Sequence, residues 1–188
     1  MRKPVDALEE ALQGDAVALA ELVSLLTPSS PAPAPAANAR QRLLAKASSP
    51  GLRWAPLFDE LSRLFDLPDG ELSKLGERSA DPSQWQAIPI AGVELFHLTG
   101  GPQVGAADAG LVRVQPGLVF PEHTHLGEER TLILEGEARE SSGQLRRPGD
   151  VLVMPGDSSH AFQVTSERPL IYALVLFGGV QIGDLRLP

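Results

Sequence analysis

The chain has 188 residues, a length that suits one domain with a sizeable hydrophobic core, or one domain with a small appendage. Hydrophobic residues make up 43% of it, and no apolar run reaches the roughly 20 residues of a membrane-spanning helix, which excludes a helical membrane protein. The formal net charge is −8, with an acidic excess on both sides of residue 80, so direct contact with nucleic acid is not expected. The absence of cysteine excludes disulfides, thiolate metal sites and cysteine nucleophiles.

An amphipathic helix is predicted over residues 5–26, because apolar residues recur there at helical spacing and acidic residues occupy the first turn. These acidic residues come before any apolar stretch of a secretory signal, so we expect a cytoplasmic protein. Residues 28–38 combine proline, alanine and serine without periodicity and predict a semi-rigid linker. The apolar positions of the helix are Leu8, Leu12, Leu19, Leu22, Val23 and Leu26.

Three more helices are predicted over residues 39–47, 56–66 and 71–78. Pro56 suits a first helical turn, and the residues that follow it place Leu57, Leu61 and Leu64 on one face. This face has two interpretations. It packs on the domain that follows, or it enters a groove on a partner protein.

The sequence pattern changes at Trp85. After this residue, short runs rich in valine, isoleucine, leucine and phenylalanine alternate with glycine, proline and aspartate. The runs are WQAIPI, VELFHL, GLVRV, RTLILEG, VLVMPG, HAFQVT and LIYALVLF. Turn sequences such as SSGQ and RPGD separate them, and no long helical pattern interrupts them. A mainly β fold, either a sandwich or a barrel, is therefore predicted.

Three of the four histidines lie in one pattern, which begins PGLVFPEHTHLGEERTLILEG and resumes at RPGDVLVMPGDSSH. Residues two apart on a strand share a face, so His123 and His125 can both point into a barrel. Glu129 follows them after a turn and can return a carboxylate to the same end, while His160 would join from another strand. Imidazole and carboxylate ligands suit a divalent ion such as zinc, iron, manganese or nickel.

Two neighbouring residues are set aside as metal ligands. His97 lacks any ligand-like spacing and is interpreted as an ordinary strand residue. Glu128 competes with Glu129, but the spacing favours Glu129 and leaves Glu128 to solvent or to a supporting position.

The spacing of Gly117, His123, His125, Glu129 and Gly136 resembles the first motif of the cupin superfamily without a gap. The resemblance implies a single cupin domain over residues 81–188, a double-stranded β-helix or jelly-roll barrel, preceded by a small helical region over residues 1–80. It also implies that the barrel holds one metal ion on the two histidines and the glutamate of this motif, together with His160.

The second cupin motif is matched by Gly149, Pro155 and His160. The chain departs from it at Asp157, where the family usually has glycine, and at Val164, where it usually has asparagine.

The order of parts resembles, more narrowly, the ChrR-type anti-sigma factors, as do the phrases LFDELSRLFDLPDG and HTHLGEERTLILEG. In that group a helical module binds a sigma factor, usually with a zinc ion of its own on histidine and cysteines, and a zinc-binding cupin domain governs the response to stress. The first 80 residues of this chain contain neither histidine nor cysteine, so a sigma-binding module here would rest on leucine packing alone. The resemblance implies one zinc ion per chain, a sigma factor as partner and a homodimer.

Two other functions stay open at the level of sequence. A small metal-dependent cupin enzyme of dioxygenase or isomerase type is the alternative, although no second general base stands at a recognisable spacing and the catalytic residues are unknown. The further candidates for such a site are Arg113, Arg130 and Tyr172. A module that binds or stores a small-molecule ligand is the third hypothesis.

Overall fold

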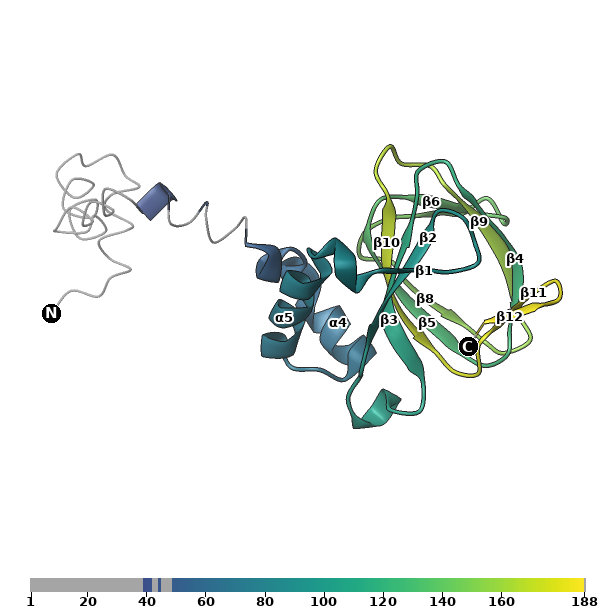
Figure 1. The fold of residues 1–188 in the computed structure, drawn as a ribbon, viewed down its shortest axis with the longest axis horizontal. Helices are drawn as coiled ribbons and strands as arrows, with labels where there is room; N and C mark the ends of the chain where they lie inside the picture. Colours follow the sequence, from purple (N-terminus) through teal and green to yellow (C-terminus); the bar gives the residue numbers. More distant parts are fainter. Residues whose placement is uncertain (1–38, 42–43, 45–48, 188) are drawn as a thin grey trace, which may run out of the picture. The chain divides into compact units, whose positions relative to one another are not determined.

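A computed structural model describes residues 39–41, 44 and 49–187 (Figure 1). The predicted helix over 5–26 and the predicted linker over 28–38 lie outside these residues, and of the predicted helix over 39–47, residues 39–41 and 44 are helical. The chain divides into two compact units, residues 1–42 and 43–188, and the predicted boundary between residues 80 and 81 lies inside the second unit. No described helix combines the length and the hydropathy that crossing a membrane requires.

Two antiparallel six-stranded sheets face each other and enclose a barrel (Figure 1). One sheet has the order β1-β2-β3-β10-β5-β8 and the other the order β12-β11-β4-β9-β6-β7. The strands are β1 (Gln86–Ala87), β2 (Val93–Leu98), β3 (Asp108–Val114), β4 (Val119–His125), β5 (Glu129–Glu135), β6 (Ala138–Glu140), β7 (Leu145–Arg146), β8 (Val151–Met154), β9 (Ser159–Val164), β10 (Leu170–Leu176), β11 (Val180–Ile182) and β12 (Leu185–Leu187). The prediction of a mainly β, cupin-like fold is confirmed.

Six of the seven predicted runs coincide with the strands β2, β3, β5, β8, β9 and β10. The run WQAIPI is the exception, because only Gln86–Ala87 joins the sheet. Pro89 has no N–H to donate to a strand ladder, so the strand cannot continue through it. The residues that follow form a turn, in which the N–H of Val93 donates to the carbonyl of Ile90. The short strands β6, β7, β11 and β12 were not predicted from sequence.

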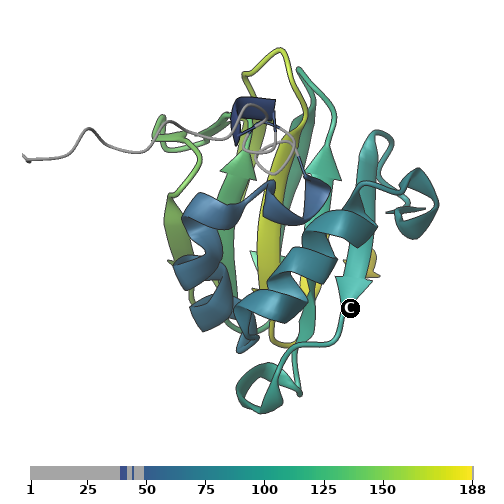
Figure 2. The ribbon, with the colours of Figure 1, turned by 90° about the vertical axis from the view of Figure 1, so that its left-hand side faces the viewer.

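Two helices cover the outer face of the first sheet, as Figure 2 shows. The predicted helix over 56–66 is α4 (Phe58–Phe65), preceded by a 3-10 turn at Ala55–Leu57, and the predicted helix over 71–78 is α5 (Asp69–Ser79). Leu61 and Phe65 are fully buried, in one apolar cluster with side chains of β5 and β10. The leucine face of α4 is therefore used to pack on the barrel, and the interpretation that it enters a groove on a partner is wrong.

A polar contact fixes the start of this helical layer to the end of β5. The carboxylate of Glu135 accepts hydrogen bonds from the guanidinium of Arg53, at 2.7 Å for Nη2, and from the buried indole Nε1 of Trp54, at 2.8 Å. A bidentate arginine pair with a third donor holds a carboxylate in one orientation. The helices and the barrel are thus joined by both apolar and charged contacts.

The two departures from the second cupin motif have structural explanations. Asp157 has a left-handed backbone (φ 64°), a conformation in which glycine is the least strained residue and aspartate is tolerated. The turn before His160 is therefore kept, and the N–H of Asp157 donates to the carbonyl of His125 at 2.8 Å. Val164 is 1% exposed and packs in the apolar core of the barrel, so no polar contact is required at that position.

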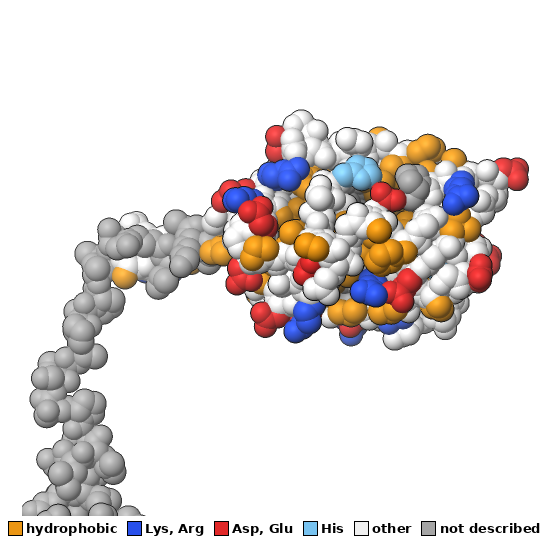
Figure 3. Space-filling view, turned by 90° about the horizontal axis from the view of Figure 1, so that it is seen from below, with side chains coloured by type: hydrophobic (Ala, Val, Ile, Leu, Met, Phe, Trp, Pro, Cys, Tyr) orange, Lys and Arg blue, Asp and Glu red, His pale blue; other side chains and the backbone are white. Residues whose placement is uncertain are grey.

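On the face of the protein in Figure 3, basic and acidic side chains are interspersed among small hydrophobic patches. No broad basic surface lies on that face, in keeping with the net charge of −8.

Candidate metal centre

Three histidines meet because two non-consecutive strands are neighbours in the second sheet. β4 pairs with β9, and in this register His123 lies directly opposite His160. A shift in the pairing between Phe120 and His123 marks an irregularity that sets this register. His125 lies two residues beyond His123 on the same inward face, so all three imidazoles point into the lumen.

Each imidazole is held through its Nδ1 atom by a different acceptor. Nδ1 of His123 lies 3.0 Å from the carbonyl oxygen of Pro121, and Nδ1 of His160 lies 2.7 Å from the carboxylate of Glu140. Nδ1 of His125 lies 3.0 Å from the hydroxyl of Ser158, which donates its own hydrogen to the carbonyl of Pro155. All three acceptors require a proton on Nδ1, and the Nε2 lone pairs are left free.

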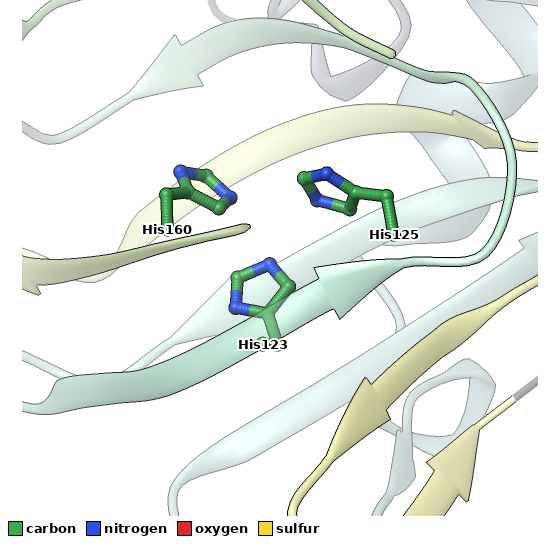
Figure 4. Close-up of side chains that lie close together, drawn as sticks. All are labelled: His123, His125 and His160. Carbon is green, nitrogen blue, oxygen red and sulfur yellow. The ribbon is translucent and has the colours of Figure 1, made fainter. Parts of the chain in front are cut away.

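The free nitrogens face a common centre, as the close-up in Figure 4 shows. One ring nitrogen of each histidine lies within 4.8 Å of the other two, and the ring centroids are 4.5 to 5.1 Å apart. Among the described residues, the Nε2 atoms of His125 and His160 are buried without any hydrogen-bond partner. Leaving a buried polar atom unpaired costs about 1–3 kcal/mol, and a cation at this centre would remove that cost. These residues therefore fit a metal ion.

Glu129 approaches the same centre from the facing sheet, at the first position of β5. It is 8% exposed, and its carboxylate oxygen lies 3.5 Å from Nε2 of His125. With the proton of His125 on Nδ1, its Nε2 atom and the ionised carboxylate of Glu129 are both acceptors and have no hydrogen between them. A cation would join them. The structure brings Glu129 beside the histidines, although less closely than they approach one another.

Burial sets the charges in the centre. It lowers the pKa of both His123 and His125 to about 4, and the neighbouring imidazoles add to this effect. Burial also raises the pKa of Glu129 to about 7. At neutral pH these two imidazoles are uncharged, as metal ligands must be, while the carboxylate is close to its own midpoint.

Glu140 is a functional residue that the sequence reasoning missed. Its carboxylate binds His160 at 2.7 Å and Arg146 at 3.4 Å, inside the hairpin formed by β6 and β7. Although its burial acts in the opposite direction, the hydrogen bonds and charge interactions with these two side chains together lower the pKa of Glu140. It thus stays ionised and fixes the ring of His160. Glu140 ends the three-residue strand β6, which is too short for a two-residue alternation to identify this residue from sequence.

The other residues considered from sequence lie away from the histidines, with one exception. His97 is exposed on β2, and Glu128 forms an exposed pair with Arg130 at 2.6 Å. Arg113 pairs with Glu94 at 2.7 Å and lies over the ring of Trp85. Tyr172 is the exception.

Tyr172 lines the cavity beside the centre. The same cavity is lined by His123, Glu129 and Arg146, and it has a volume of about 30 Å³, which is room for a water molecule or two. Burial raises the pKa of the Tyr172 hydroxyl well above its usual value, so it stays protonated and can donate a hydrogen bond in this cavity.

These pKa values predict the pH dependence of the metal-free protein. Between pH 6.5 and 4.5, His123 and His125 are protonated in the unfolded chain but not in the folded protein. Over the same range Glu129 is protonated in the folded protein but not in the unfolded chain. The net difference is up to one proton. We therefore expect the free energy of unfolding to fall by up to about 1.4 kcal/mol per pH unit between pH 6 and 5.

Urea unfolding in the presence of a chelator at pH 7, 6 and 5 measures this slope. His97→Ala, which removes an exposed imidazole, should keep it, whereas His123→Ala should remove most of it. A free energy that rises between pH 6 and 5 would show that the two buried imidazoles titrate normally, because only the proton held by Glu129 would then distinguish the folded from the unfolded chain.

A model of the ChrR cupin-like domain matches residues 78–178, more than half of the chain. The chain belongs to the ChrR cupin-like domain family. The narrower resemblance seen in the sequence is therefore confirmed. The match spans the barrel from the end of α5 to the turn after β10, and it includes all four of the predicted ligands.

One solved structure agrees with this family assignment at the level of the fold. The complex of SigE with the anti-sigma factor ChrR from Rhodobacter sphaeroides is 21% identical and has a TM-score of 0.51, with 92% of this chain and 83% of that chain covered. A protein of unknown function with a cupin-like fold from Ralstonia eutropha JMP134 is 25% identical, with a TM-score of 0.43, over 51% of this chain and 63% of that one. The match thus spans less than two thirds of the Ralstonia protein.

An acetylacetone dioxygenase from Acinetobacter johnsonii is 12% identical, with a TM-score of 0.47, over 57% of this chain and 80% of that chain. A comparison with curated protein sequences gave no match.

Proposed function

We propose that this member of the ChrR cupin-like family is a regulator whose barrel binds one divalent metal ion, zinc as first choice, through His123, His125, His160 and Glu129. The observation that carries the proposal is the convergence of three imidazoles whose Nδ1 atoms are occupied and whose Nε2 atoms are free. Bound metal would supply a positive charge that holds the two sheets together at this end of the lumen. The protein residues orient the ligands and keep water away from them.

Metal analysis tests this proposal directly. Protein purified without added metal should contain close to one ion per chain, and removal with a chelator should lower the melting temperature, because an ion that binds only the folded state stabilises it. Zinc would support the regulator. Protein that takes up no divalent metal under any condition would contradict the proposal.

Glu140 should set the affinity of this site. Glu140→Ala removes the acceptor for the Nδ1 proton of His160 and leaves Arg146 without its carboxylate, so metal affinity should fall by about 10- to 100-fold. Competition with a chromophoric chelator measures the change. The matched control is Glu137→Ala, which breaks an exposed pair with Arg147 near the same hairpin and should leave the affinity unchanged. Equal effects of the two substitutions on metal affinity would show that Glu140 does not support the site.

The proposed partner is a sigma factor, and the proposed binding element is the leucine-rich segment over residues 5–26. Two features support this assignment: the family match and the use of the α4 leucine face for packing on the barrel. Capture experiments with the full chain should recover a sigma factor, and the pair Leu12→Asp and Leu19→Asp should abolish the capture. Val119→Asp, at an exposed position of the barrel, is the control. Recovery of a sigma factor by the double variant would contradict the assignment. The homodimer and the cytoplasmic location stay predictions.

A metal-dependent enzyme is the second candidate, and the observation that favours it is that Tyr172 lines the cavity beside the histidines. Iron or manganese in the purified protein, together with oxygen consumption on addition of small organic substrates, would support it. A zinc-loaded protein without such activity would favour the regulator.

A further inference from the structure

The lumen of the barrel contains a series of adjoining cavities. The cavity of about 30 Å³ beside His160 shares His123, Glu129 and Tyr172 with a second cavity of about 60 Å³. The second cavity in turn shares six side chains with a third cavity of about 180 Å³ at the end of the barrel near β12. The shared side chains are Ile88, Leu95, Val112, Leu174, Leu176 and Leu187.

The outer cavity reaches the protein surface. Its lining includes His97 and Asp108, both of which are exposed. The histidine cluster lies at the opposite end of the series. A molecule that moves from the surface to the histidines along this path passes only apolar side chains between the two polar ends, and those shared by the second and third cavities are all aliphatic.

The lining decides which molecules can follow this path. All six side chains common to the second and third cavities are aliphatic, so a charged molecule would lose its hydration there without gaining a partner. Apolar cavities of roughly 150 Å³ in proteins stay dry and accept small apolar molecules. The third cavity has about this size, and apart from His97 and Asp108 at its mouth its lining is apolar.

We infer that the lumen contains a binding site for a small, uncharged, largely apolar molecule, which enters beside β12 and reaches the histidine cluster through the aliphatic passage. Only one part of this inference rests on the proposed function, namely that the bound molecule acts as the effector of the metal centre. The binding itself requires no metal.

Xenon and iodide provide a matched pair of probes, because they have the same number of electrons and differ in charge. In methyl NMR of the full chain, xenon should shift the signals of Leu95, Val112 and Leu187 in a saturable manner, while iodide at the same concentrations should leave them unchanged. No shift with xenon would overturn the inference. Equal shifts with iodide would overturn the restriction to uncharged molecules.

Substitutions at the wall of the passage test its location. Val112→Phe adds bulk between the second and third cavities and should weaken xenon binding roughly tenfold or more, equivalent to about 1.4 kcal/mol. Val153→Phe adds the same bulk at an exposed position of β8 and should have no effect. Leu95→Phe is the second wall variant, for use if Val112→Phe does not fold. Undiminished xenon binding in the folded wall variant would overturn the passage.

Metal content is measured on the same preparations, which separates the two proposals. Xenon binding by a protein that takes up no metal would support the apolar passage and contradict the metal centre. Stoichiometric metal without xenon binding would support the metal centre and contradict the passage.

Discussion

His123→Ala and His160→Ala should each reduce the metal content of the purified protein from near one ion per chain to background. Each substitution removes one of three nitrogens that lie within 4.8 Å of one another and leaves at most two imidazoles and a carboxylate. Residues that only support a ligand contribute about 10- to 100-fold to metal affinity, and loss of a ligand itself should exceed that range. Elemental analysis gives the content, and chelator competition gives the affinity.

His97→Ala is the matched control for both variants, because it also removes an imidazole from the barrel but from an exposed position on β2. It should keep full metal content. A second readout is the melting temperature, which added zinc should raise in the control and leave unchanged in the two ligand variants. Retention of metal by both ligand variants would place the metal elsewhere, as would its loss from the control.

The elements that could be predicted from sequence are those whose pattern has one physical meaning. The runs that became β2, β3, β5, β8, β9 and β10 combine branched apolar residues with turn residues at their ends, and both signals favour strands. The pair His123 and His125 follows from the two-residue period of a strand. The contribution of His160 required the pairing of β4 with β9, which the cupin resemblance supplied and the periodicity alone did not.

Other features could not be predicted because their pattern fits several structures. Helical spacing shows that Leu61 and Leu64 share a face, but it does not show what covers that face. Glu140 belongs to a three-residue strand, too short for alternation to identify, and its role becomes visible only when the hairpin places it beside His160. The left-handed backbone of Asp157 likewise could not be predicted, because aspartate adopts this conformation more readily than most residues but does not require it.

Leu61→Ala should destabilise the entire compact unit, and not merely α4. Leu61 is fully buried in a cluster that includes Leu132 of β5 and Ala173 of β10. Removal of a fully buried leucine side chain costs about 2–5 kcal/mol, because the transfer free energy is lost and a cavity remains. A value in the upper part of this range is expected, since α4 lies against both β5 and β10.

Urea unfolding followed by tryptophan fluorescence and by far-ultraviolet circular dichroism measures this effect. Trp54 reports on the helical layer and Trp85 on the start of the barrel, so coincident transitions would show that the two parts unfold together. Leu185→Ala, at a position that is 36% exposed on β12, is the control and should cost much less. If the substitution at Leu61 abolished only the helical signal, the helices would be an independent layer. A shift of the whole transition would show that β5, which carries Glu129 at its start, depends for its stability on the helices behind it.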